Sequence, residues 1–161
     1  MIGFLRHLFG GGEPALSEAT ARDAGAIAAL HAVSFRRGWS DQEVEGMLID
    51  RAVIAHRAMT GRALAGFVIA RQAADEAEIL SIAVAHRAQG RGLAQQLLAL
   101  HLRRLPGLGA RTVFLEVDEH NEPAIKLYEH AGFREISRRP NYYPLPGGKY
   151  AAALVLRRDM A

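Results

Sequence analysis

The chain has 161 residues, half of them hydrophobic and 23% charged, which suits one globular domain with a buried core. It contains no cysteine, which excludes disulfides, thiolate metal sites and a cysteine nucleophile and favours a reducing, cytoplasmic location. The net charge of +3 suits an anionic ligand but does not by itself indicate nucleic-acid binding. No apolar run is as long as a membrane-spanning helix requires. We therefore expect neither direct nucleic-acid binding nor membrane insertion.

Residues 1–13 are expected to form a flexible tail ahead of a single domain at 14–161. The tail has a short apolar and basic stretch and then Gly10-Gly11-Gly12, without the longer apolar core and cleavage site of a secretory signal. Ile2 follows Met1, which excludes a myristoylation signal. We interpret this segment as a tail that folds onto the domain or touches a partner.

The first half of the domain alternates between strand and helix patterns. A short strand is expected at 15–19, followed by a helix at 20–35 with apolar residues at helical spacing. Ser40 and Glu43 form a capping box that opens a second helix. Three strand-like runs joined by hairpin turns follow at 52–56, 63–71 and 77–85. The last run is almost wholly apolar, which predicts a central strand buried on both faces.

The second half continues the alternation. A glycine-rich turn leads into a helix that reaches about residue 105, and a strand follows at 111–117. Asn121 caps a helix that ends at Gly132. Strands at 133–138 and 150–156, joined by a loop rich in Pro, Gly and Tyr, close the chain. This order predicts an α/β fold, with one mixed sheet of six or seven strands flanked by four helices.

The glycine-rich turn is the first candidate binding site. Gly90 and Gly92 let backbone N–H groups approach a phosphate, which the following helix N-terminus also favours. No Gly-Lys-Ser/Thr follows, which excludes a P-loop, and the three preceding strands fit a dinucleotide-binding fingerprint poorly. Alone, such a turn is more often a tight connection; its position after the most apolar strand favours phosphate binding.

The turn and several later segments resemble one enzyme family. In Gln89, Gly92 and Ala94 the turn resembles the pyrophosphate loop of GNAT acetyltransferases, Q/R-x-x-G-x-G/A, and the element order matches that fold. Further resemblance to the family lies in Leu115-Glu116-Val117, Asn121, Leu127-Tyr128 and Gly132-Phe133. Two segments resemble the RimI type, the ribosomal-protein-alanine N-acetyltransferases: Gly38-Trp39-Ser40 and Arg139-Pro140-Asn141-Tyr142-Tyr143-Pro144. The resemblance covers residues 16–156.

This resemblance implies acetyl-CoA as the co-substrate and assigns residues to it. The pyrophosphate would lie on the turn and the helix start, at Gln89, Gly90, Arg91, Gly92, Leu93, Ala94 and Gln95. The pantetheine arm would pair with the backbone of Ile82, Ala83 and Val84 and contact Asn121, with an N–H near Val84 facing the thioester oxygen. Alone, the three apolar residues are typical of core packing and Asn121 of a helix N-cap. No metal is expected, because the histidines show no ligand spacing.

The resemblance also casts Glu116 and Tyr128 as the catalytic pair. Glu116 lies near the end of a strand with apolar neighbours, facing a cleft, and would accept the acceptor's proton, directly or through a water. Tyr128 would protonate the departing thiolate, because a phenol with a pKa of about 10 keeps its proton at neutral pH. Without the resemblance, Glu116 is more often a surface residue paired with an arginine, and Tyr128 a core tyrosine.

Aromatic residues are assigned to the acceptor. By resemblance, Trp39 and the loop residues Asn141, Tyr142 and Tyr143 flank an acceptor peptide, which aromatic rings can hold by area and hydrogen bonds. The usual target of the RimI type implies acetylation of an N-terminal alanine on a small-subunit ribosomal protein. Two alternatives stay open: acetylation of a small amine or lysine side chain, and a non-catalytic acyl-CoA-binding module, which Glu116 and Tyr128 disfavour.

Overall fold

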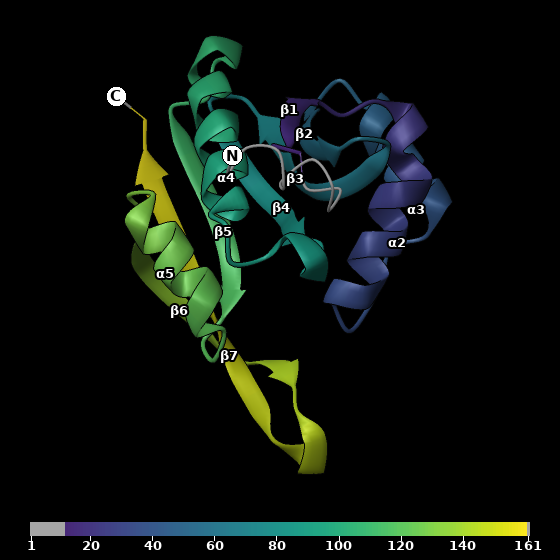
Figure 1. The fold of residues 1–161 in the computed structure, drawn as a ribbon. Helices are drawn as coiled ribbons and strands as arrows, with labels where there is room; N and C mark the ends of the chain where they lie inside the picture. Colours follow the sequence, from purple (N-terminus) through teal and green to yellow (C-terminus); the bar gives the residue numbers. More distant parts are fainter. Residues whose placement is uncertain (1–11, 161) are drawn as a thin grey trace, which may run out of the picture.

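A computed structural model describes residues 12–160. Within them, seven strands form one mixed sheet in the order β1-β2-β3-β4-β5-β7-β6, flanked by four α-helices (Figure 1). The strands are β1 (Ala15–Glu18), β2 (Val53–Thr60), β3 (Ala63–Ala73), β4 (Glu76–Val84), β5 (Thr112–Asp118), β6 (Arg134–Pro144) and β7 (Tyr150–Asp159). The helices are α2 (Ala24–Ser34), α3 (Asp41–Ile49), α4 (Leu93–Arg104) and α5 (Glu122–His130). The predicted fold class and element order are confirmed.

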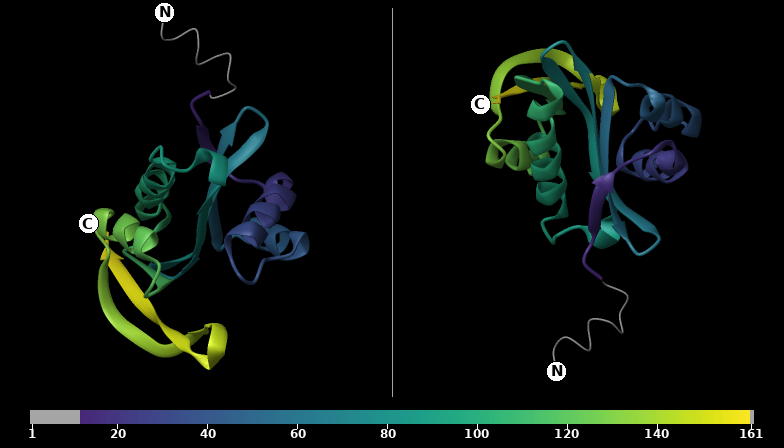
Figure 2. Two further views of the ribbon diagram at one scale, coloured as in Figure 1. Left: turned by 60° about the horizontal axis from the view of Figure 1, so that its bottom comes forward. Right: turned by 90° about the horizontal axis from the view of Figure 1, so that it is seen from above.

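The helices cover the sheet in two layers, α2 and α3 on one face and α4 and α5 on the other (Figure 2). Ile27, Val44 and Phe67 belong to the core beneath α2 and α3, whereas Leu97 and Leu115 belong to the core beneath α4 and α5. Most of the predicted tail at 1–13 lies outside the described residues. None of the helices among the described residues is long and apolar enough to cross a bilayer.

The side chains predicted to cap helices do so in the structure. Ser40 precedes α3, and its hydroxyl accepts a hydrogen bond from the Glu43 N–H at 3.1 Å. The Glu43 carboxylate in turn accepts one from the Ser40 N–H at 2.7 Å, so the predicted capping box is confirmed. The Asn121 side chain accepts a hydrogen bond from the Ala124 N–H at 3.3 Å, so this residue is a helix N-cap.

Two expectations about strands are wrong. The strand with a continuous buried run is β3, at residues 65–70, whereas β4 has half-buried Leu80, Ile82 and Val84 because these residues line a cleft. Asn141, Tyr142 and Tyr143 lie within β6 rather than in a loop. Pairing of β6 with β7 breaks after Arg139 and resumes at Tyr143, with Asn141 at a φ of 54°, so one irregular strand resembles a loop in sequence.

The sheet opens between its two parallel strands. β4 and β5 pair only from Glu76 with Thr112 to Ile79 with Leu115. Pairing of β4 with β3 is irregular at this point, because Ile79 and Ser81 have partners on β3 and Leu80 has none. Beyond the irregularity β4 keeps its β3 partners and separates from β5 (Figure 1). The β5-facing backbone edge of 80–84 is therefore free of strand pairing.

Candidate active site

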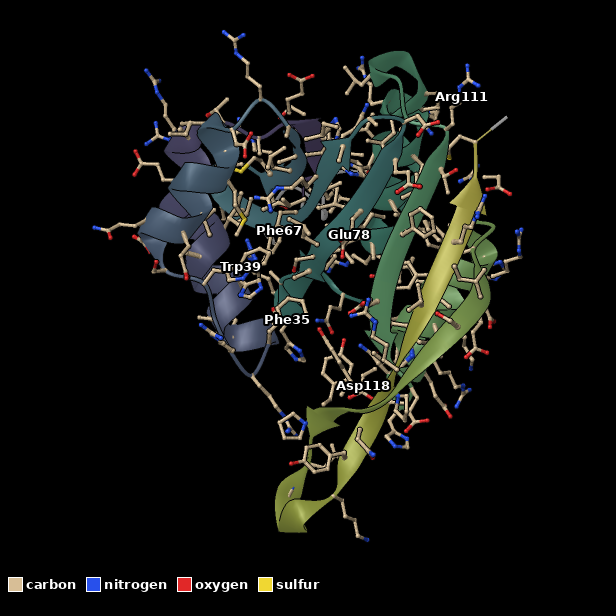
Figure 3. The ribbon with its side chains drawn as sticks, turned by 180° about the vertical axis from the view of Figure 1, so that it is seen from behind. Phe35, Trp39, Phe67, Glu78, Arg111 and Asp118 are labelled. Carbon is tan, nitrogen blue, oxygen red and sulfur yellow. The ribbon has the colours of Figure 1, made fainter. Side chains whose placement is uncertain are left out.

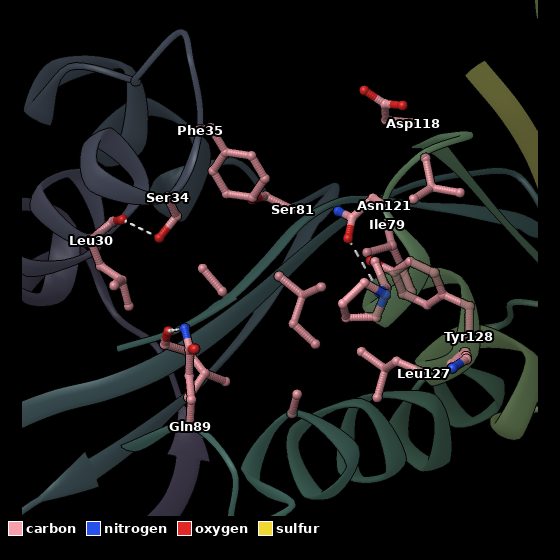
Figure 4. A pocket seen from close by; sticks show the side chains of 18 of the residues that line it. Leu30, Ser34, Phe35, Ile79, Ser81, Gln89, Asp118, Asn121, Leu127 and Tyr128 are labelled. Atoms are coloured by element: carbon pink, nitrogen blue, oxygen red, sulfur yellow. Dashed lines mark hydrogen bonds between the residues drawn. The ribbon is translucent and has the colours of Figure 1, made fainter. Parts of the chain in front are cut away.

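A cavity of about 1470 Å³ lies where β4 and β5 separate. Its walls are the end of β4, the end of β5 and one side of α5, and the glycine-rich turn lies at one end (Figure 4). The opposite end is bounded by the segment after α2 and by Tyr143 and Pro144 of β6. We call these the turn end and the rim end of the cleft.

The turn end is built from open backbone. Gly90 and Gly92 have φ angles of 78° and 76°, a region that side chains rarely adopt. A Cβ at Gly90 would meet nothing within 4 Å, and one at Gly92 only the Gln95 side chain at 3.9 Å. Gly92 precedes α4, and no side chain caps that helix. The first N–H groups of α4 are thus available to an anion.

Most of the predicted cofactor residues line this cleft: Ile82, Ala83, Val84, Gln89, Gly90, Gly92, Leu93, Ala94, Gln95 and Asn121. Arg91 is exposed and lies outside the lining. The Gln89 amide nitrogen donates to the Val84 carbonyl oxygen at 3.1 Å (Figure 4). Gln89 therefore fastens the turn to the end of β4.

Glu116 lies on β5, and its side chain is 22% exposed in the cleft wall. Its Oε1 is 3.2 Å from Nη1 of Arg139 on β6, and β7 lies between the two strands. Arg139 pairs in register with Ala153 on β7, a residue small enough for the long side chain to pass over. Arg139 also lies over the Tyr142 ring, 5.8 Å from its centroid. The surroundings of Glu116 are thus less apolar than the sequence predicts.

Tyr128 lies on α5 with 7% of its surface exposed and lines the same cleft. Its ring packs edge-on against Phe133, with centroids 5.8 Å apart. Burial, together with nearby Tyr143, raises the pKa of Tyr128 to about 12. Burial, followed by the charge of Glu116, also raises the pKa of Tyr143. Both phenols therefore keep their protons throughout the neutral range.

The rim end differs from the sequence expectation. Of the four predicted acceptor residues, Tyr143 lines the cleft, whereas Trp39, Asn141 and Tyr142 do not. Further residues that the sequence did not predict line the cleft after α2 (Phe35, Arg36 and Arg37) and on β5 and α5 (Asp118, Lys126 and His130). Phe35 is 40% exposed although it is large and apolar, which only the structure reveals. The Arg36 guanidinium donates to the Pro144 carbonyl oxygen and so joins the two sides of the rim.

Comparison with known proteins then places the chain. Residues 24–133 match the family model described as the Acetyltransferase (GNAT) family, and they contain all the cleft-lining residues except Tyr143 and Pro144. The chain belongs to the GNAT acetyltransferase family.

Two relatives of this GNAT protein carry the name [Ribosomal protein bS18]-alanine N-acetyltransferase. The chain is 34% identical to the Escherichia coli K12 protein over 117 residues, 73% of this chain and 78% of that protein. It is 38% identical to the Haemophilus ducreyi protein over 90 residues, 56% of this chain. That match spans only 62% of the Haemophilus ducreyi protein.

Solved structures show the same fold over nearly the whole chain. The ribosomal-protein-S18-alanine N-acetyltransferase from Escherichia coli superposes with a TM-score of 0.83 and 29% identity, covering 92% of this chain and 96% of that one. Arabidopsis thaliana NAA60 in complex with acetyl-CoA superposes with a TM-score of 0.81 at 19% identity, covering 91% and 98%. The second likeness concerns the fold alone.

Proposed function

We propose that this protein transfers the acetyl group of acetyl-CoA to the N-terminal α-amine of a protein, with the N-terminal alanine of a small-subunit ribosomal protein as the acceptor. The observation that carries the proposal is one continuous cleft. Its lining includes the open glycine turn, the free edge of β4, the Glu116 carboxylate and the protonated Tyr128 phenol. The names of the relatives support the choice of acceptor. A chain without cysteine acting on a ribosomal protein fits the cytoplasm.

The turn end fits acetyl-CoA, which supplies an activated acetyl thioester and an anionic pyrophosphate. Gly90, Gly92 and the first turn of α4 would bind the phosphates through backbone N–H groups and the helix N-terminus. The free edge of 80–84 would hydrogen-bond the amides of the pantetheine arm as an added strand does. Asn121 faces this part of the cleft while it caps α5.

Glu116 would act as the base. An N-terminal ammonium has a pKa of about 8, so a carboxylate acting directly or through one water suffices to remove its proton. The freed amine then forms the new C–N bond as the C–S bond breaks. Arg139 holds the Glu116 carboxylate in place from the side of β6.

Tyr128 would act as the acid that protonates the leaving thiolate. Its phenol keeps its proton because its pKa is about 12, so a donor is present when the sulfur departs. A phenol this weak gives up its proton only as negative charge develops on the sulfur. From ammonium to amide the nitrogen loses two protons. Glu116 takes the first and releases it to solvent, and the second, lost once the C–N bond has formed, replaces the proton that Tyr128 gives to the thiolate. The products are the amide, the free thiol of CoA and one proton.

Two peptides of equal length test the proposal. One begins with a free alanine, and the other has a blocked N-terminus and an internal lysine. We expect acetylation of the first peptide and little of the second, because lysine has a pKa of about 10.4 and a modest base deprotonates it poorly. A faster reaction with the blocked peptide would replace the proposal with a lysine or small-amine acetyltransferase. Tight acetyl-CoA binding without turnover of either peptide or a polyamine would indicate a non-catalytic module.

A further inference from the structure

Three rings stack beside the rim end of the cleft. His31 on α2 is 4% exposed and lies between Trp39 and Phe35. Its centroid is 3.9 Å from the Trp39 ring at an interplanar angle of 10°, and 4.5 Å from the Phe35 ring at 30°. Figure 3 shows Trp39 and Phe35 on the α2 side of the sheet. This stack explains why Trp39 is absent from the cleft lining.

A hydrogen bond also joins two of the stacked residues, His31 and Trp39. The Trp39 backbone N–H donates to Nδ1 of His31 at 3.1 Å. This bond requires an Nδ1 without a hydrogen, which the neutral ring provides when its proton is on Nε2. Burial lowers the pKa of His31, although the charge of Glu43 on α3 acts in the opposite direction. The ring is therefore a neutral acceptor at pH 7.

The stack holds a segment that forms part of the cleft. Residues 35–39, the rim segment, begin at Phe35, where the chain turns to an extended conformation after α2. Gly38 lies so close to α2 that a Cβ there would be 2.9 Å from the Ala32 Cα. At the other side of the cleft, Arg36 donates to the Pro144 carbonyl oxygen. The rim segment is thus fixed to α2 by His31 and reaches β6 through Arg36.

We propose that His31 is a positioning residue for the acceptor: its stack and hydrogen bond place Phe35 and Arg36 at the rim where the acceptor enters. The identity of the acceptor rests on the proposed function, whereas the positioning rests on the contacts of His31. His31 itself lies outside the cleft lining, so it acts through the rim segment.

Two substitutions separate the contribution of ring stacking from that of the hydrogen bond. His31→Phe keeps a flat ring for stacking and removes the acceptor of the Trp39 N–H, whereas His31→Gln keeps an acceptor and removes the ring. We expect His31→Phe to raise the acceptor KM about three- to tenfold, the range for one lost hydrogen bond, with kcat and the acetyl-CoA KM within twofold of wild type. The matched control is Val113→Ala, which opens a cavity in the core beneath α4 and α5, whereas Trp39 packs against the other core. It should lower the Tm and leave the acceptor KM unchanged.

Fluorescence supplies a measurement that does not depend on turnover. Trp39 is the only tryptophan in the chain, so the intrinsic emission comes from this stack. In His31→Phe and His31→Gln we expect altered emission and easier quenching of Trp39 by acrylamide, whereas Val113→Ala should resemble wild type. Unchanged quenching, or an acceptor KM equal to that of wild type despite a lowered Tm, would show His31 to be core only. Failure of wild type to acetylate any N-terminal peptide would overturn the proposed function, and the quenching would still decide the positioning.

Discussion

The two ends of the cleft are built in different ways. The turn end is made of backbone from one continuous segment, from the end of β4 through the start of α4. The rim end depends on side chains that join distant segments: the Arg36 guanidinium donates to the carbonyl oxygen of Pro144, 108 residues away. A site made of backbone is sensitive mainly to substitutions that change the backbone conformation, such as those at glycines. A site made of side chains can be altered by a substitution at any one of them. We therefore expect substitutions at the two ends to affect different substrates.

The largest effect should come from Tyr128, which lies between the two ends. Tyr128→Phe removes only the hydroxyl and keeps the ring packed on Phe133. We expect kcat to fall about 10²–10⁴-fold, the usual contribution of a positioned acid, with acetyl-CoA binding and the Tm close to wild type. Steady-state kinetics and a thermal melt measure both. A folded variant with wild-type kcat would assign Tyr128 to the core alone.

The pH dependence offers a second measurement on the same residue. Because the pKa of Tyr128 is raised to about 12, the acid form persists as the pH rises and is lost only near that value. We expect kcat/KM to rise as the acceptor amine deprotonates, near its pKa of about 8, and then to stay level through pH 10. A fall between pH 9 and 10 that disappears in Tyr128→Phe would show that Tyr128 loses its proton in this range, and would contradict its raised pKa.

A smaller effect is expected at the turn end, and it should be confined to the cofactor. Gly92→Val places a β-branched side chain at a φ of 76°, a strain of about 1–3 kcal/mol, and blocks the backbone near the start of α4. The acetyl-CoA KM should rise about tenfold or more, while the acceptor KM stays unchanged. Gly61→Val is the control, because Gly61 has a φ of 61° and lies in the β2–β3 turn. An acetyl-CoA KM that is equal in both variants would reject the assignment.

The difference between the two ends also explains what the sequence could predict. The turn end follows from contiguous residues, since Gly90 and Gly92 between a strand and a helix already imply open backbone. The rim end depends on tertiary contacts: Trp39 stacks on a histidine eight residues earlier, and Arg139 reaches Glu116 across β7. The break in β6 pairing near Asn141 also looks like a loop in sequence. Side-chain partners of this kind have no local pattern.

At the rim end, Arg36→Gln should affect the other substrate. The substitution removes the guanidinium that donates to the Pro144 carbonyl oxygen, so the two sides of the rim are no longer joined. We expect the acceptor KM to rise about two- to fivefold, because the lost hydrogen bond is exposed, and the acetyl-CoA KM to stay unchanged. Arg62→Gln in the exposed β2–β3 turn is the matched control. An increase in the acetyl-CoA KM instead would remove the division between the two ends.

The smallest effect should come from Arg139, since its ion pair with Glu116 is screened: the Arg139 side chain is 59% exposed. Without this cation the Glu116 carboxylate is held in place less firmly, so kcat of Arg139→Gln should fall about twofold, within the range for an exposed ion pair. Arg139→Lys should restore most of the activity, and steady-state kinetics measures both. Arg138→Gln is the control, because Arg138 pairs with Glu119 and Glu135 instead. If Arg138→Gln lowered kcat as far as Arg139→Gln, the effect would belong to net charge, and the contact of Arg139 with Glu116 would have no particular role.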